Sequence, residues 1–85
     1  MGSDAMPSGP QIRAARALIG ISAAELAARA GVTWKTVQRF ESVEAVRASR
    51  GGTLERVKAA LEAEGIEFTG DPITSPGVRL NRKKR

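Results

Sequence analysis

The chain contains no cysteine and no histidine. Their absence excludes disulfide bonds, thiol nucleophiles and zinc fingers, and it removes the side chain that most often serves as a general base. The sequence also shows no long apolar run, no signal-peptide pattern and no phosphate-cradling glycine motif. We therefore expect a cytoplasmic protein that needs no metal or other cofactor, does not enter a membrane and is not an enzyme.

Aromatic residues are scarce as well, at 4% of the 85 residues, whereas alanine and leucine-type residues are frequent. A chain of this length can bury only one modest core. The composition therefore favours one small helical bundle over a sandwich of two sheets.

The net charge of +5 is unevenly distributed along the chain. Residues 79–85 carry five positive charges and no acidic residue, so the preceding residues are neutral in sum. Within that neutral part, basic residues gather in and beside residues 21–41, while acidic residues gather in residues 54–64. One basic face and one acidic face are therefore expected on the same small domain.

Residues 21–41 carry the pattern of two short helices joined by a tight glycine turn. Ser22 and Glu25 match a capping box, in which the hydroxyl and the carboxylate each bond a backbone N–H left free at a helix start. Gly31 stands where a helix end commonly needs a left-handed residue. The pattern predicts a helix over residues 23–30.

A second helix is predicted over residues 34–41, with Thr33 as its N-cap. Val37 and Phe40 give this helix one apolar edge that can pack back on the preceding helix. At about 100° per residue, the opposite face presents polar side chains, with Trp34 and Thr36 at its flanks. These polar side chains are Lys35, Gln38 and Arg39.

Apolar residues at helical spacing predict two further helices, over residues 11–19 and 54–64. Thr53 is expected to cap the second of them, and Gly65 to end it. Residues 42–48 are a candidate for a short additional helix.

Beyond Gly65 the pattern changes to an alternation of apolar and charged residues. This period of two predicts short strands over residues 66–68 and 78–80, and the turn-forming residues between them favour a hairpin.

The two ends of the chain are expected to lie outside the folded domain. Residues 1–9 are polar and glycine-rich, could include residues left by cloning, and are predicted to be flexible. Residues 81–85 are predicted to form a disordered basic tail. The expected organisation is a domain over residues 10–65, followed by strands within residues 66–80.

The span of residues 11–61 resembles the phage-repressor-like helix-turn-helix regulators of the XRE type. The matching residues are Arg16, Ser22, Glu25, Leu26, Ala27, Ala30, Gly31, Val32, Val37 and Glu41. The resemblance implies a mainly α, lambda-repressor-like bundle of four to five helices, here followed by the strand pair. The chain departs from the family pattern at Ala23, where many relatives have a phosphate-contacting glutamine, and over residues 42–52, where many have a short glycine turn.

In such regulators the second helix of the motif, here residues 34–41, enters the major groove of DNA. The resemblance and the exposed polar face together imply base contacts by Trp34, Lys35, Thr36, Gln38 and Arg39. Phosphate contacts are expected from Ser22, Thr33, Arg47 and Arg50. The resemblance also implies a structural ion pair between Arg16 and Glu41. The alternatives are an ordinary solvated face for the polar residues and a half-buried core position for Trp34.

The leading functional hypothesis is a sequence-specific DNA-binding transcriptional regulator, acting as a repressor or autoregulator. One alternative is the antitoxin of a toxin–antitoxin pair, which would use the same reader and bind a toxin through its strands. Another is a protein-interaction module without DNA specificity. A homodimer is expected because one reading unit covers few base pairs. The predicted interface comprises Ile66, Phe68, Val78 and Leu80.

Overall fold

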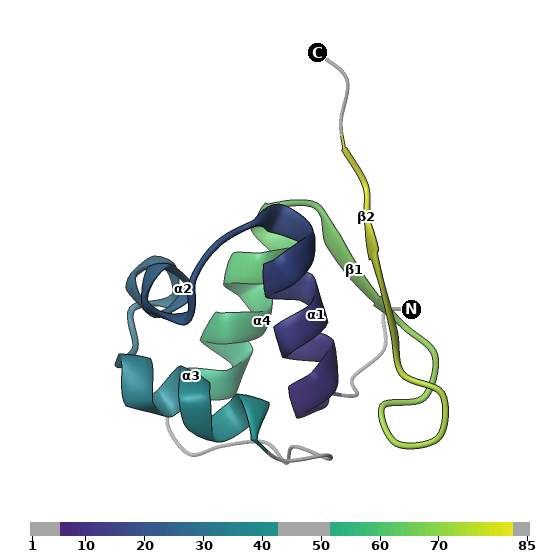
Figure 1. Cartoon of the computed structure of the whole chain (residues 1–85), viewed down its shortest axis with the longest axis horizontal. Helices are drawn as coiled ribbons and strands as arrows, with labels where there is room; N and C mark the ends of the chain where they lie inside the picture. The colour runs from purple at the N-terminus through teal and green to yellow at the C-terminus, as the bar shows by residue number, and fades with distance from the viewer. Residues whose placement is uncertain (1–5, 43–51, 83–85) are drawn as a thin grey trace.

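The computed structural model describes residues 6–42 and 52–82 of the chain. Over these residues the protein is mainly helical, with four helices followed by one antiparallel pair of strands (Figure 1). The helices are α1 (Gly9–Ile19), α2 (Ala23–Ala30), α3 (Trp34–Glu41) and α4 (Thr53–Ala63), and the strands are β1 (Ile66–Thr69) and β2 (Gly77–Leu80). The helix considered for residues 42–48 lies almost wholly outside the described residues, as do Arg47 and Arg50.

The core lies where the four helices meet, with α2 and α3 on one side of α1 and α4 and the strand pair on the other (Figure 1). Apolar residues at helical spacing bury one edge of each helix. The buried apolar side chains are Ile12, Ala15, Leu26, Ala27, Ala30, Val37, Phe40, Leu54, Val57, Leu61 and Ile66. None of the helices in the described part of the chain is long and apolar enough to cross a membrane.

Helices α2 and α3 begin and end as the sequence predicts. The Ser22 hydroxyl accepts from the backbone N–H of Glu25 at 3.0 Å, and the Glu25 carboxylate accepts from the N–H of Ser22 at 3.1 Å. Gly31 ends α2 in the left-handed region, with φ of 71°. Thr33 then caps α3 by accepting from the N–H of Thr36 at 3.2 Å. The connection between the two helices is therefore short and locally determined.

The boundaries of α1 and α4 differ from the prediction. Residues 6–9 were expected to be flexible, but Ser8 is buried and caps α1 through a capping box with Gln11. This box matches the same pattern as the one in α2, and the polar composition around it concealed it. At α4, the expected cap Thr53 is instead the first residue, and Gly52 occupies the N-cap position with φ of 71°. The same helix ends at Ala63 with Glu64 as its C-cap, and not at Gly65 as predicted.

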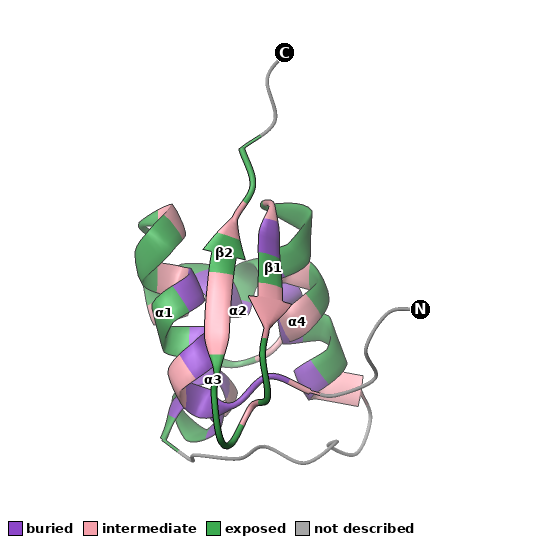
Figure 2. Cartoon of the chain, turned by 90° about the vertical axis from the view of Figure 1, so that its right-hand side faces the viewer, coloured by how far each residue is buried: buried purple, intermediate pink, exposed green. Residues whose placement is uncertain are grey.

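The strands pair in antiparallel register, with Ile66 opposite Leu80 and Phe68 opposite Val78. These four side chains share the face of the sheet that lies across α1 and α4 (Figure 2). Ile66 is only 4% exposed, and the other three are half-buried against the core. The outer face carries an exposed ion pair between Arg79 and Glu67.

Gln11 joins the helical part to the strand pair. Its side-chain Nε2 donates to the carbonyl oxygens of Thr69 at 3.2 Å and Gly77 at 2.8 Å, which face each other at the turn end of the sheet. The same side chain completes the capping box of α1. One buried amide thus fixes the start of α1 and the position of the strands on it.

Candidate functional site

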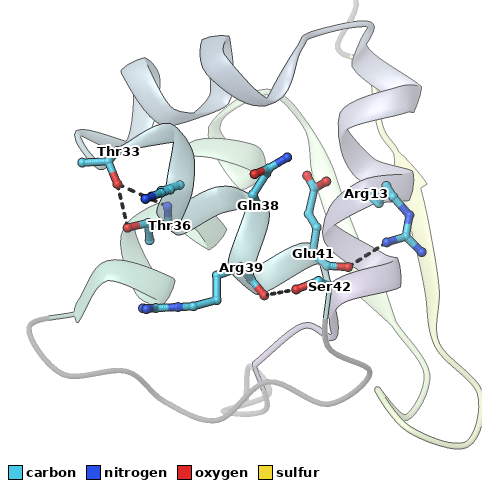
Figure 3. A pocket seen from close by; sticks show the side chains of 8 residues that line it. Arg13, Thr33, Thr36, Gln38, Arg39, Glu41 and Ser42 are labelled. Carbon is cyan, nitrogen blue, oxygen red and sulfur yellow. Dashed lines mark hydrogen bonds between the residues drawn. The ribbon is translucent and has the colours of Figure 1, made fainter.

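The candidate site is the polar face of α3. Val37 and Phe40 are buried beneath this helix, so the opposite face is held toward solvent. A surface depression lies along that face and continues to α1 (Figure 3). The residues that line it are Arg13, Thr33, Lys35, Thr36, Gln38, Arg39, Glu41 and Ser42.

Three of the five residues predicted to contact bases, Lys35, Gln38 and Arg39, are exposed and line the depression together. Thr36 also lines it, but its hydroxyl is 2.9 Å from that of Thr33, so the two threonines form part of the cap. Trp34 lies outside the lining and is 49% exposed.

Arg16 and Glu41 meet as the resemblance implies. Arg16 Nε lies 2.6 Å from Glu41 Oε2, and Arg16 Nη2 lies 3.0 Å from Glu41 Oε1. The side chains are 21% and 9% exposed, so water screens the pair only in part. The hydrogen bond to Glu41 and the carboxylate charge raise the pKa of Arg16 above its ordinary value, although burial opposes the shift. The pair joins α1 to the last residue of α3.

Arg13 is a site residue that the sequence reasoning missed. Its Nη1 donates to the backbone carbonyl of Glu41 at 2.7 Å, which places the guanidinium beside the C-terminal end of α3 (Figure 3). Arg13 precedes Arg16 by three residues and therefore lies one turn away on α1. The expected pairing of Arg16 with Glu41 was the available signal, since it brings this part of α1 to the end of α3.

Among the described residues, the positive charges of the depression have no acidic counterpart of their own. Across residues 6–42 and 52–82, Arg13, Lys35 and Arg39 make no ion pair. Glu41, the acidic residue in the lining, is already paired with Arg16. Arg29, expected to contribute to the basic face, instead pairs with Glu64 at 2.6 Å. The depression is thus a concave, positively charged surface that suits an anionic ligand.

The two predicted phosphate contacts within the described residues differ in their relation to the depression. Thr33 is at the N-terminal end of the depression, whereas Ser22 is exposed at the start of α2 and does not line it. The described part of the chain shows no group of three or more acidic, cysteine or histidine side chains that could hold a metal ion.

The packing of the strands changes the argument for the dimer interface. Ile66, Phe68, Val78 and Leu80 were expected to need a second subunit to cover them. They pack instead on the helices of their own chain, because the register places all four on the inner face of the sheet. Because their own chain covers these four side chains, they give no reason to place a dimer interface at the strands.

The comparison with known proteins gives no family assignment: no protein-family model and no curated protein matches this sequence.

Proposed function

We propose that the protein is a sequence-specific DNA-binding transcriptional regulator in which α2 and α3 act as a helix-turn-helix and α3 enters the major groove. The observation that carries the proposal is the arrangement of α3. One edge of the helix is buried, and the opposite face presents Lys35, Gln38 and Arg39 from one concave, basic surface.

The side chains on this face have the chemistry that base edges require. Arg39 and Lys35 can donate to the O6 and N7 acceptors of guanine, and the Gln38 amide can bond adenine at N6 and N7. Each good bidentate contact contributes about 1–3 kcal/mol of discrimination against the wrong base. Trp34 is exposed at the first turn of α3, where its indole can pack on a thymine methyl group or a sugar.

The caps of α2 and α3 fit contacts with the DNA backbone. Backbone N–H groups at a helix start bind anions readily, and Ser22 and Thr33 occupy these two starts. Arg47 and Arg50, if they contact phosphates, do so from outside the described residues. Such contacts fix the register of the reader on the duplex without specifying sequence.

A protein of this kind represses by occupying an operator. A single α3 spans only a few base pairs, so we propose that a homodimer places two copies on half-sites one helical turn, about 34–36 Å, apart. The outer edges of the strand pair pair with no other strand in the described part of the chain, so two copies could join there through backbone hydrogen bonds and not through the four inward side chains.

The packing of the strands removes one support for the antitoxin alternative. A toxin that needs apolar surface would not find it on the sheet faces, because the inner face packs on α1 and α4 and the outer face carries the Glu67–Arg79 pair. The same observation gives no support to a protein-interaction module built on the strand faces.

Selection from random duplexes tests the proposal. The full-length protein is incubated with a pool of random DNA duplexes, and the bound molecules are amplified and sequenced over several rounds. We expect enrichment of one short motif, repeated with two-fold symmetry at the spacing of a helical turn. If the protein binds the pool but no sequence is enriched, it has only general affinity for nucleic acid. That result would refute specific regulation.

A further inference from the structure

We propose that Arg13, which lies on α1, holds a backbone phosphate of the bound DNA at the C-terminal end of α3. This inference rests on the proposed function. It holds that a residue outside α3 makes the phosphate contact that positions the C-terminal end of α3 on the DNA.

The guanidinium of Arg13 is held in place while most of its donors stay available. Its Nη1 donates to Glu41 O at 2.7 Å, and no other hydrogen bond joins the Arg13 side chain to the described residues. A guanidinium has five N–H donors in a planar fork that matches two oxygens of a phosphate. The bond to Glu41 therefore orients the group without using up its capacity.

Three groups that would repel a phosphate at this helix end are already bonded within the described residues, namely two carbonyls and one carboxylate. The carbonyl end of a helix carries partial negative charge, equivalent to about half an elementary charge. Here Arg13 covers the carbonyl of Glu41, and the Ser42 hydroxyl donates to that of Arg39 at 2.9 Å. Both oxygens of the Glu41 carboxylate accept hydrogen bonds from Arg16.

The neighbours of Arg13 point to phosphate and not to a carboxylate-bearing peptide. The same depression holds Lys35 and Arg39, which we assign to base edges, and it runs along α3 from Thr33 to Ser42. When a helix lies in the major groove, the sugar-phosphate strands border its two ends. Arg13 lies beyond the C-terminal end of the polar face of α3. At that position the nearest part of the duplex would be the sugar-phosphate backbone of the DNA and not a base edge.

Binding measured against salt concentration tests the inference. Dissociation constants of wild type, Arg13→Gln and Arg13→Lys are measured on the selected duplex and on a random duplex. We expect Arg13→Gln to weaken binding to both duplexes by the same factor and to lower the slope of log K against log salt by about 0.9, the value for one phosphate contact. Arg13→Lys keeps the charge and should keep most of the slope. Arg79→Gln, which removes one charge from the outer face of the sheet, is the matched control and should leave the slope unchanged.

Neutral methylphosphonate groups placed at single positions of the selected duplex locate the contact. At one phosphate in each half-site, the neutral group should weaken wild-type binding and have no effect on Arg13→Gln. If Arg13→Gln keeps the wild-type slope, or every phosphate affects both proteins equally, Arg13 only caps α3 and the inference is wrong. Both measurements are interpreted only if the wild-type protein binds its selected duplex more tightly than the random duplex. A wild-type protein without this preference would refute the proposed function and the inference together.

Circular dichroism melting shows at which temperatures each variant is folded, and the constants are compared below those temperatures. Should Arg13→Gln be too unstable, Arg13→Met replaces it, since it also removes the charge while keeping the length of the aliphatic chain. A changed base preference in either variant would make Arg13 a base reader and contradict the phosphate assignment.

Discussion

At the scale of single residues, the contact between Arg16 and Glu41 determines how α3 is held on α1. Both oxygens of the carboxylate accept from the same guanidinium, and neither side chain is fully solvated. Replacing one partner leaves the other charge in a partly dry environment, which costs more than the intact pair contributes. The pair is therefore expected to orient the helix more than to stabilise the fold.

A double-mutant cycle on thermal unfolding tests this coupling. Arg16→Met and Glu41→Gln should each lower the stability, and the double variant should lose less than the sum of the two, with a coupling energy of about 0.5–3 kcal/mol. Arg79→Met and Glu67→Gln form the matched cycle, because that pair is exposed, and its coupling should be close to zero. Additive losses at Arg16 and Glu41 would show that the pair does not form in solution.

The Asp71 carboxylate gives a pH-dependent prediction at the hairpin turn. It accepts from the N–H groups of Thr74 at 3.0 Å and Ile73 at 2.8 Å, and these bonds lower the pKa of Asp71. Because the folded pKa is lowered, the stabilisation is present above the unfolded pKa and is lost as pH falls through the folded value. NMR titration of the two amide protons should show a transition at a pH below the ordinary range for aspartate. The transition should vanish in Asp71→Asn, and a transition in the ordinary range would contradict the bonded turn.

At the scale of elements, local patterns predicted most of the secondary structure. The capping box of Ser22, the cap at Thr33 and the alternation after Gly65 are each complete within a few residues, and all three appear in the structure. Contacts between distant residues were not predictable in this way. Gln11 bonds Gly77 across 66 residues, and Arg13 bonds Glu41 across 28. Such pairs depend on how the elements pack, which no local period encodes.

The junction between α4 and β1 should tolerate a side chain poorly. Gly65 has φ of 99°, and a Cβ added there would lie 2.4 Å from the carbonyl oxygen of Asn81. Gly20, which ends α1, has φ of 72° and open space around it, so its replacement costs only the left-handed conformation, about 1–2 kcal/mol. We expect Gly65→Ala to lower the melting temperature clearly more than Gly20→Ala. Equal losses would mean that the strands do not pack against Gly65 in solution.

At the scale of the whole molecule, the strand pair belongs to the fold. Ile66 is part of the core, and Gln11 bonds carbonyls of both strands. The sequence suggested a separable element because a change of period looks like a boundary. It could not show that the inner face of the sheet would cover α1 and α4.

Two truncations test this integration. A chain that ends before residue 66 should lose cooperative thermal unfolding, because its core is left open on one side. Deleting residues 83–85 removes three positive charges and should leave the melting curve unchanged, while weakening DNA binding in a salt-dependent way. Calorimetry separates the two expectations, and a cooperative transition in the shorter chain would show that the helices fold without the strands.

Sedimentation tests the proposed assembly on DNA. The protein should bind the selected duplex as two copies, since the site is expected to hold two half-sites. A complex of one chain per duplex with undiminished specificity would rule out the dimeric reader while leaving the role of α3 intact.

The central claim, that α3 reads base sequence, is tested most directly by the ratio of dissociation constants for the selected and a random duplex. We expect Lys35→Ala combined with Arg39→Ala to bring this ratio close to one with little change in helicity or melting, because both side chains are exposed and make no ion pair within the described residues. Arg79→Ala combined with Arg82→Ala removes the same charge at the strands and should keep the ratio. An unchanged ratio in the α3 variant would contradict the claim.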